Sequence, residues 1–442
     1  MLHFGTSGRK APPTVFSDAI KKHPPTSVTS NNIRHLERAL RSIPWASQTN
    51  AKRYGQDGMD EMPAFIKRAQ GCRMWDLDDR EFIDYRCALG PIILGYRYGP
   101  VDEAVREQMK LGTLFSMSSP IEAEAAEKIL NTLGWADKIR FMKTGADACT
   151  CCVRLARSRT KRDHILTIGY HGYHDWFAFQ WPKPGVPEAL KEFVHEVAYG
   201  DLEAIDRVFA SHGNQLAAAI TVPLEWHLNP DKAFIQHLRT KCDEYGTALI
   251  FDEVLTGFRM SKAGAVDYFG VEPDLAAYAK GMANGYPLSA YAGTNEWMNT
   301  LDQTIITTTY AGETLSLAAT CAVMDVFHKE PVHEHIATKG QTLRKGFEDI
   351  FNETGFPATT IGVDQGAVID FSQAGNEAEN LHKNLFNKLY AKGIFANVQW
   401  FISYSHQEVD IEETLKAMRE SIRELSKVSK PTTISSKQSH RS

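Results

Sequence analysis

LIFDEVLTGFR (residues 249–259), followed by VEPDLAAYAKGMANGYPLSAYAG (residues 271–293), is the stretch of sequence that decides the fold. The apolar run before Asp252 and the apolar run before Lys280 predict buried strands of a parallel sheet, which is covered on both faces. The carboxyl ends of neighbouring parallel strands share one edge of a sheet, and ligands bind at that edge. We therefore expect Asp252 and Lys280 to reach into one crevice.

Strand and helix patterns alternate on the amino-terminal side of this stretch. Apolar runs predict further strands at His164–Ile168 and Ala217–Val222, and apolar periodicity closed by a glycine predicts helices at Ile121–Leu133 and Phe234–Tyr245. Strand, helix and strand in repetition indicate an α/β domain with a mostly parallel sheet. No internal repeat is evident.

After about residue 330 the pattern changes. A helix is expected near Ile336–Ile350, strands at Gly366–Phe371 and Gly393–Ser403, and a closing helix at Asp410–Leu425. This order predicts a smaller α+β domain. A hairpin with an acidic turn at Met74–Tyr85 indicates that the N-terminal part packs with it.

The expected division of the chain follows from these patterns. We expect a flexible, Pro- and Ser-rich arm at 1–30, a segment at 31–75 that packs with the small domain, a large cofactor-binding domain at 76–330, a small domain at 331–430 and a disordered tail at 431–442.

Composition excludes several classes of protein. The 442 residues are 43% apolar and 23% charged with a net charge of −5, which is typical of a globular chain and does not favour binding to nucleic acid or to an anionic membrane. Seven cysteines, an odd number, and the lack of a secretory-type N-terminus predict a reduced, cytoplasmic protein that acts on small molecules.

An aspartate and a lysine in one crevice are the groups that pyridoxal phosphate (PLP) requires. The lysine amine forms a Schiff base with the cofactor aldehyde, and the aspartate keeps the pyridine nitrogen protonated, so that the ring acts as an electron sink. Spacing alone is weak evidence, because a solvated lysine and a helix-capping aspartate give the same pattern.

Three further motifs add to this site. Thr144, Gly145 and Ala146 open a helix, so their backbone could cradle a phosphate, although an ordinary helix cap is also compatible. Tyr170, in a loop of aromatic and histidine residues, could stack on a planar cofactor or simply fill a domain interface. Thr309 lies in a hydroxyl-rich stretch that leads into a helix.

Metal binding is not expected. The loop of histidines and aspartates at 171–175 has no helix-spaced pair elsewhere to complete a set of ligands. Cys149, Cys151 and Cys152 sit inside a predicted helix and point in different directions, so they are interpreted as small packing side chains.

Together these motifs resemble the class III PLP-dependent aminotransferases of fold type I, and most closely the branch that contains glutamate-1-semialdehyde aminomutase. The resemblance runs from about Pro44 to about Leu425. It rests on the motif at 251–259, on Pro273-Asp-Leu with Lys280-Gly, and on the motif at 89–96. It implies a large domain with a seven-stranded sheet and a smaller α+β domain.

The resemblance also implies roles for individual residues. Lys280 would carry the Schiff base and move protons, and Asp252 would pair with the pyridine nitrogen. Val254 and Tyr170 would flank the ring. The phosphate would be held by Thr144, Gly145 and Ala146, with Thr309 reaching it from the neighbouring subunit of a homodimer.

This chain departs from the family pattern at several positions. Ala146 and Asp147 stand where Thr and Glu are usual, and Val222 replaces a glutamate beside the substrate channel, for which Glu225 or Trp226 could compensate. Glu313-Thr314 replaces the common Asn-Pro. These departures leave the substrate open.

Three functions are compatible with the sequence. The first is an aminotransferase that moves an amino group between an amine donor and a carbonyl acceptor in a ping-pong cycle. The second is an intramolecular aminomutase acting on glutamate 1-semialdehyde, against which the stretch Thr304–Thr308 lacks the Gly/Ser-rich lid we would expect. The third is a binding protein that has lost catalysis, against which the site residues are all present.

Overall fold

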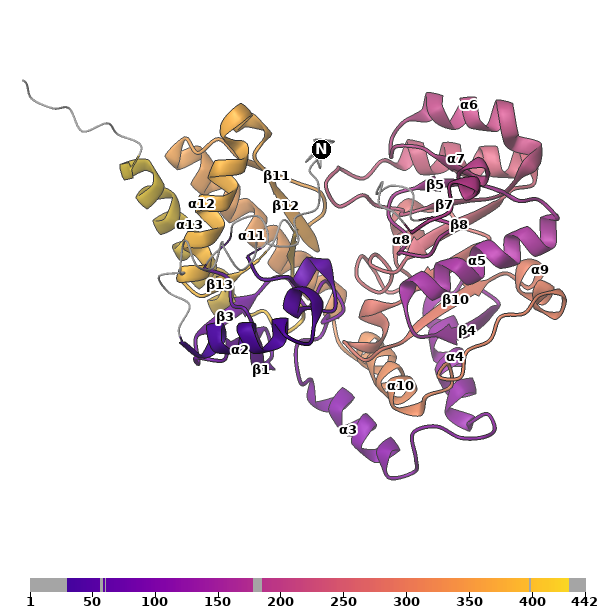
Figure 1. Ribbon diagram of the computed structural model, residues 1–442, viewed down its shortest axis with the longest axis horizontal. Coiled ribbons are helices and arrows are strands. Elements are labelled where there is room, and N and C mark those ends of the chain that lie inside the picture. The colour runs from indigo at the N-terminus through magenta and orange to yellow at the C-terminus, as the bar shows by residue number, and fades with distance from the viewer. Residues whose placement is uncertain (1–29, 56–58, 60, 178–184, 397–398, 429–442) are drawn as a thin grey trace, which may run out of the picture.

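The structure is a computed structural model that describes residues 30–55, 59, 61–177, 185–396 and 399–428. The expected tail at 431–442 and nearly all of the expected N-terminal arm lie outside these ranges. A large α/β unit lies on one side of the molecule, and helices α11–α13 with the N-terminal strands lie on the other (Figure 1).

The large unit is built on a seven-stranded sheet in the order β4-β10-β9-β8-β7-β5-β6. Strands β5 to β9 run parallel, and β10 is antiparallel to both of its neighbours. The α/β fold with a mostly parallel seven-stranded sheet is therefore confirmed. The strands are β4 Lys138–Met142, β5 His164–Ile168, β6 Val194–Glu196, β7 Leu216–Thr221, β8 Ala248–Glu253, β9 Leu275–Tyr278 and β10 Ser289–Gly293.

Both faces of this sheet are buried, as the apolar runs predict. In β8, Ala248 and Ile250 pack in a cluster with the buried face of α5, whereas Leu249 and Phe251 pack in the main core. Asp252 has the parity of Ile250 and therefore points to the α5 face. The sheet thus delivers a carboxylate to the interface with one particular helix.

Helices cover the sheet and connect its strands. Those of the large unit are α3 Gly99–Met109, α4 Pro120–Leu133, α5 Gly145–Thr160, α6 Leu202–His212, α7 Lys232–Tyr245, α8 Ala265–Phe269, α9 Asn295–Met298 and α10 Thr314–Lys329. Gly134 and Gly246 end α4 and α7 in the left-handed conformation, as expected for C-terminal glycines.

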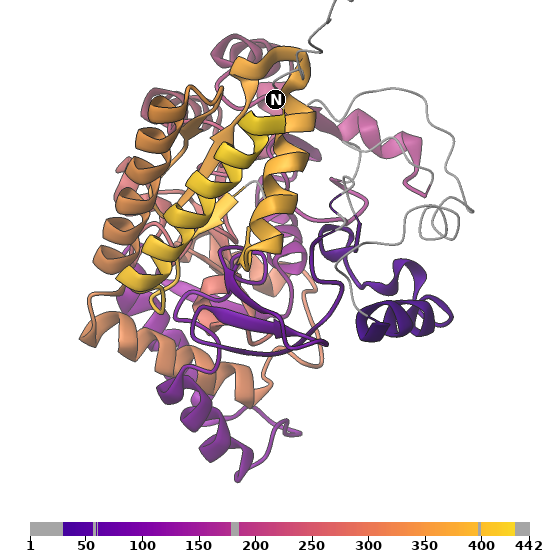
Figure 2. The ribbon, with the colours of Figure 1, turned by 90° about the vertical axis from the view of Figure 1, so that its left-hand side faces the viewer.

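The small unit joins both ends of the described chain. One sheet has the order β1-β2-β3-β13 and the other has β11-β12-β14. The elements are α2 Ser30–Leu40, β1 Ile66–Gln70, β2 Arg73–Asp76, β3 Glu81–Asp84, α11 Val332–Thr354, β11 Thr359–Ile361, β12 Gly366–Asp370, α12 Ala378–Ala391, β13 Ile394–Phe395, β14 Gln399–Phe401 and α13 Glu408–Val428. Figure 2 shows the N-terminal strands beside α13.

One sequence expectation in this unit is wrong and another is confirmed. The single strand expected at Gly393–Ser403 is wrong, because β13 pairs with β3 and β14 pairs with β12, so this segment passes from one sheet to the other. The predicted hairpin is confirmed as β2 and β3. Since β3 belongs to the same sheet as β13, this sheet extends past position 75, and the division into domains remains a prediction.

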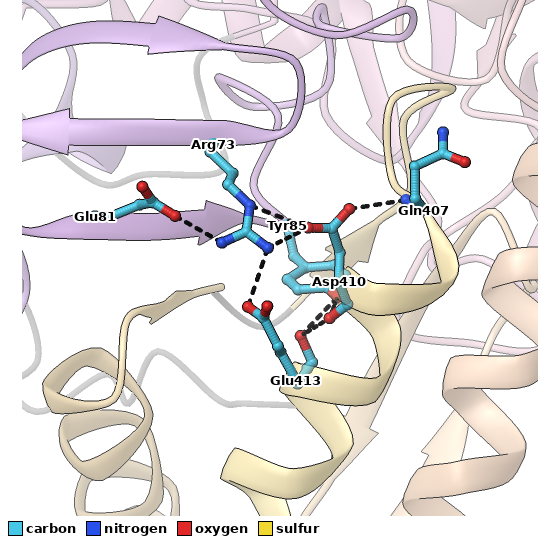
Figure 3. Close-up of polar contacts among 7 residues, drawn as sticks. Arg73, Glu81, Tyr85, Gln407, Asp410 and Glu413 are labelled. Atoms are coloured by element: carbon cyan, nitrogen blue, oxygen red, sulfur yellow. Dashed lines mark hydrogen bonds and ion pairs between the residues drawn. The ribbon is translucent and has the colours of Figure 1, made fainter.

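A partly exposed ion network ties β2 to α13 (Figure 3). The Arg73 guanidinium donates to Asp410 from Nε at 3.1 Å and from Nη2 at 2.6 Å, and it also donates to Glu81 and Glu413. Burial alone would raise the pKa of Asp410, but hydrogen bonds from the Gln407 amide and from Arg73 lower it instead. Because Arg73 is 27% exposed, the pair contributes less than the roughly 3 kcal/mol lost on breaking a fully buried pair.

The closing helix α13 buries the apolar stripe that the sequence predicts. Ile411, Met418 and Ile422 are fully buried, and Leu415 and Leu425 pack against the same core. Each fully buried aliphatic side chain stabilises the fold by about 1.5–3 kcal/mol. Within the described part of the chain, no helix is both long and apolar enough to cross a bilayer.

Candidate active site

Lys280 lies two residues after the end of β9 and begins a short 3-10 turn, Lys280–Ala283. Its backbone has φ 47°, a left-handed conformation that is strained for a residue with a side chain. The Thr320 hydroxyl donates to the Met282 carbonyl at 2.6 Å and holds this turn against α10. The strain is thus maintained by packing at the end of β9.

The turn after Lys280 is also anchored to the N-terminal part of the chain. The Asn284 side chain accepts hydrogen bonds from the amides of Ile93 and Leu94 at 3.1 and 2.9 Å and donates to the Gly95 carbonyl at 3.0 Å. These contacts give the motif at 89–96 a physical role, because it fixes the loop that carries the lysine.

Asp252 lies in β8, the strand next to β9, and three groups donate to its carboxylate. The Val254 amide donates to Oδ1 at 3.1 Å, and the Cys149 thiol donates to Oδ2 at 3.4 Å. His171 Nδ1 lies 2.8 Å from Oδ2. Asp252 and the His171 side chain are both buried, so these donors replace water around the carboxylate and hold it in one orientation.

The environment of Lys280 changes its ionisation. Burial lowers the pKa of the amine most strongly, the Asp252 charge raises it, and the Arg259 charge lowers it further, with a resulting pKa of about 8. At neutral to mildly alkaline pH a substantial fraction of the amine is therefore uncharged. An uncharged amine is the nucleophilic and basic form.

Arg259 has a structural role, because its guanidinium binds two backbone carbonyls. Its guanidinium donates to the Ile402 carbonyl at 2.9 Å and to the Gly90 carbonyl at 2.7 Å, and it lies 4.9 Å from the Phe401 ring. Arg259 is buried, so it joins the large unit to the small one and supplies a fixed positive charge near Lys280.

The predicted phosphate loop opens α5. The Thr144 hydroxyl accepts from the Asp147 amide and the Asp147 carboxylate accepts from the Thr144 amide, so the two residues form a capping box. The Ser289 hydroxyl donates to the Thr144 carbonyl at 2.6 Å and ties the loop to β10. The amides of Gly145 and Ala146 lack acceptors within an α-helix and are suited to an anion.

Close packing fixes Gly145, Ala146 and Val254 relative to one another. A Cβ at Gly145 would lie 2.7 Å from both Val254 methyl groups, so only glycine lets the loop approach β8 this closely. A Cβ at Gly172, where φ is +111°, would lie 2.5 Å from the Ala146 Cβ. The loop that carries Tyr170 therefore rests on the start of α5.

The remaining predicted site residues lie on accessible surfaces. The Tyr170 side chain is 53% exposed, which leaves ring surface for a ligand. Thr309 is exposed, in a segment that precedes α10. Glu313 caps α10 through the amides of Leu315 and Ser316 and pairs with Lys143 at 3.1 Å, so the Glu313 variant links this segment to the residue before Thr144.

The departure at Val222 affects packing as well as charge. A Cβ at Gly169 would lie 2.3 Å from Val222, so this valine fits under the loop that leads to Tyr170. Glu225 is partly buried, and burial raises its pKa while the nearby His171 lowers it. Trp226 packs edge-on against Phe401 at 5.3 Å and has a structural role.

Sequence reasoning missed the parts played by His171 and Cys149. Their ligand atoms and those of Asp252 lie within 4.8 Å of one another, a group that could hold a metal ion. Both side chains already donate to the carboxylate, so we assign them to positioning Asp252. One sequence signal could have pointed to His171. It directly follows Tyr170, close after the end of β5.

The comparisons with known proteins agree with this geometry. Residues 54–422 match the family model of class-III aminotransferases. The chain belongs to the class-III aminotransferase family. It is 31% identical over 394 residues to a glutamate-1-semialdehyde 2,1-aminomutase of Sulfurihydrogenibium sp. (strain YO3AOP1), with 82% of this chain and 92% of that protein covered. It is 32% identical over 382 residues to a 3-aminobutyryl-CoA aminotransferase of Cloacimonas acidaminovorans (strain Evry), with 83% and 91% covered.

Solved structures show the same fold. The FumI protein of Sphingopyxis sp. MTA144, in its PLP internal aldimine form, superimposes with a TM-score of 0.83 at 28% identity, covering 90% of this chain and 97% of that protein. The expected fold type I architecture, the enzyme class and PLP as cofactor are confirmed by this family membership.

The residues present fit PLP. His171 Nε2 is buried and has no hydrogen-bond partner among the described residues, so the Nδ1 atom is left to donate to Asp252. The amine of lowered pKa, the glycine loop at a helix N-terminus and an exposed tyrosine ring complete a donor set for an aldehyde, a phosphate and an aromatic ring.

His171 is a positioning residue, and its replacement should reduce turnover. We expect His171→Phe to lower kcat by about 10–100-fold, the usual cost of losing a group that orients a functional side chain, with a smaller change in KM. His171→Gln keeps a donor and should recover part of this loss. Steady-state kinetics and the pH dependence of cofactor absorbance measure both effects, and wild-type kinetics in the phenylalanine variant would contradict the role.

Proposed function

We propose that this chain is an intermolecular aminotransferase that moves an amino group from an amine donor to a carbonyl acceptor, with Lys280 as its catalytic lysine. One observation carries the proposal: a lysine amine with a pKa of about 8 and a buried, hydrogen-bonded aspartate stand at the ends of adjacent strands β9 and β8.

Each predicted site residue has a place in this proposal. When bound, PLP supplies an electron sink for negative charge that develops on the substrate carbon. The residues that would hold it are Lys280 by its amine, Asp252 at the ring nitrogen, Tyr170 and Val254 at the ring faces, and Thr144, Gly145, Ala146 and Thr309 at the phosphate.

The chain's own groups can move and hold the protons that amino transfer needs. Nζ of Lys280 in its neutral form takes a proton from the substrate carbon and returns it later in each half-reaction. The Asp252 carboxylate is held in one orientation because His171, Cys149 and the Val254 amide all donate to it. The carboxylate can therefore keep a proton on the pyridine nitrogen when PLP is bound.

Lys280→Ala should abolish turnover and covalent attachment of the cofactor, because Lys280 is the lysine on which the Asp252 charge acts, whereas Lys143, at the same edge of the sheet, is paired with Glu313. Borohydride reduction of the holoenzyme followed by peptide mapping identifies the attached residue. Lys262→Ala, which changes a lysine on the loop after β8, is the matched control and should leave both properties unchanged. A label on any lysine other than Lys280 would overturn the assignment.

Intramolecular amino transfer is the second candidate, supported by the similarity to a glutamate-1-semialdehyde 2,1-aminomutase. The two candidates differ in their need for an amine. An aminomutase converts glutamate 1-semialdehyde with no second amino donor, whereas an aminotransferase requires one. A screen of amines by cofactor absorbance, followed by assays with one substrate or two, separates the candidates and identifies the donor class.

We further propose a homodimer in which Thr309 reaches the partner's phosphate site. Several apolar side chains stand exposed around α3 and before α10, which is typical of an interface: Met109, Leu111, Phe115, Met117, Ile305 and Tyr310. The Thr314 hydroxyl donates to the Gly112 carbonyl at 2.8 Å, so these two segments form one surface. Figure 1 shows α3 projecting from the body of the large unit.

Met117→Asp, which places a charge on a side chain that is 82% exposed, should dissociate the dimer in light scattering and weaken cofactor binding. Thr309→Ala should weaken cofactor binding but leave the dimer intact. Lys345→Asp, on the exposed face of α11, serves as the control. A monomer with full cofactor affinity in the wild-type protein would contradict the proposal.

The free, buried state of all seven cysteines supports the proposed cytoplasmic location. The partners we propose are a small-molecule amino donor and a carbonyl acceptor, without a nucleic acid or membrane role.

A further inference from the structure

Three histidines meet at the outer edge of the large sheet. His164 begins β5, His195 lies in β6, and His212 ends α6. His164 Nδ1 lies 2.9 Å from His195 Nε2, and one ring nitrogen from each of the three histidines lies within 4.8 Å of the others. His195 and His212 lie 31 and 48 positions after His164 in the sequence, so only the fold brings the three together.

The three rings are stacked on one another. His164 and His195 lie 5.2 Å apart between ring centroids with 6° between planes, and His195 and His212 lie 4.1 Å apart with 21°. All three are partly buried. Charged imidazoles would repel one another here, and burial together with His212 and His164 lowers the pKa of His195 to about 4.

We infer that His164, His195 and His212 form a binding site for a divalent transition-metal ion of the zinc class. In a tetrahedral site with Zn–N distances of about 2.1 Å, the ligand nitrogens are about 3.4 Å apart. The His164 and His195 nitrogens, now 2.9 Å apart, must open slightly to reach this spacing. Three imidazoles suit Zn²⁺, Cu²⁺ or Ni²⁺ and not Mg²⁺, which prefers oxygen ligands.

This site is separate from the cofactor site. Strands β7 and β5 lie between β8, which carries Asp252, and β6. His164 is at the amino end of its strand, whereas the catalytic residues stand at the carboxyl ends. In Figure 1, α6 and β5 lie on the side of the molecule away from α11–α13. An ion here would act on stability rather than on the reaction.

The position suggests what the ion does. β6 has three residues and, among the described residues, pairs only with β5, so it is a short edge strand. One ion bound to β5, β6 and the end of α6 would tie this short edge strand to its neighbouring strand and to the end of a helix. Binding to the folded state alone stabilises it in proportion to the logarithm of the free metal concentration.

The test uses the full-length holoenzyme after treatment with a chelator. Calorimetric titration with Zn²⁺ should show one ion bound per chain at micromolar concentrations, with a raised thermal midpoint and an unchanged cofactor spectrum. Mg²⁺ should show no binding. Electron paramagnetic resonance of the Cu²⁺-loaded protein should show coupling to imidazole nitrogens.

Variants locate the site. His195→Gln and His212→Gln should each weaken zinc binding by at least about 100-fold, because a direct ligand is worth more than the 10–100-fold of an orienting group. His237→Gln, which changes a histidine on α7 that pairs with Asp206 on α6, is the matched control and should bind zinc normally. His212→Gln should keep wild-type transaminase activity.

Absence of zinc binding by the folded wild-type protein at high micromolar Zn²⁺ would overturn the inference. Undiminished binding in both variants would overturn it equally, because the ion would then be held elsewhere. Circular dichroism of each variant shows whether it is folded, and if His195→Gln is not, His212→Gln alone decides.

Discussion

The placement of a lysine amine and a carboxylate at the ends of two adjacent buried strands is the constraint on which this structure depends. Asp252 pairs in register with Ala277 across β8 and β9, and Lys280 follows three residues later. The apolar sheet removes water from both groups, which costs free energy unless each charge is compensated. Three hydrogen-bond donors bind the Asp252 carboxylate, whereas burial lowers the pKa of the Lys280 amine.

Much of the surrounding structure serves this arrangement. Thr320 and Asn284 hold the strained turn at Lys280, Gly145 brings the start of α5 against β8, and Arg259 joins the two units while adding a positive charge near the amine. These contacts come from segments far apart in the sequence. Mutations at such positions would therefore act on the lysine without touching any substrate.

The sequence was sufficient for the parts of the fold that repeat a local pattern. Buried strands β7, β8 and β9 and the glycine-capped helices α4 and α7 all follow from apolar periodicity and local end signals. The segment at 393–403 was not predictable in the same way, because it contributes one strand to each of two sheets. Which residues join which sheet depends on the positions of β3 and β12.

Prediction of the site from the sequence was limited in the same way. Asp252 and Lys280 could be paired from the topology of parallel strands, and the loop residues from family resemblance. His171 and Cys149 could not be linked to Asp252, since they lie 81 and 103 positions away and their role appears only when α5 and the loop after β5 reach this carboxylate. The histidine stack on β5, β6 and α6 was invisible for the same reason.

The pKa of Lys280 in the cofactor-free protein tests the central claim most directly. The pH dependence of reductive methylation at Lys280, followed by mass spectrometry with exposed Lys345 as an internal reference, measures it. We predict a pKa of about 8 in the wild type and a lower value in Asp252→Asn, because the Asp252 charge raises the pKa of the amine. An ordinary lysine pKa above 10, unchanged by Asp252→Asn, would contradict the account.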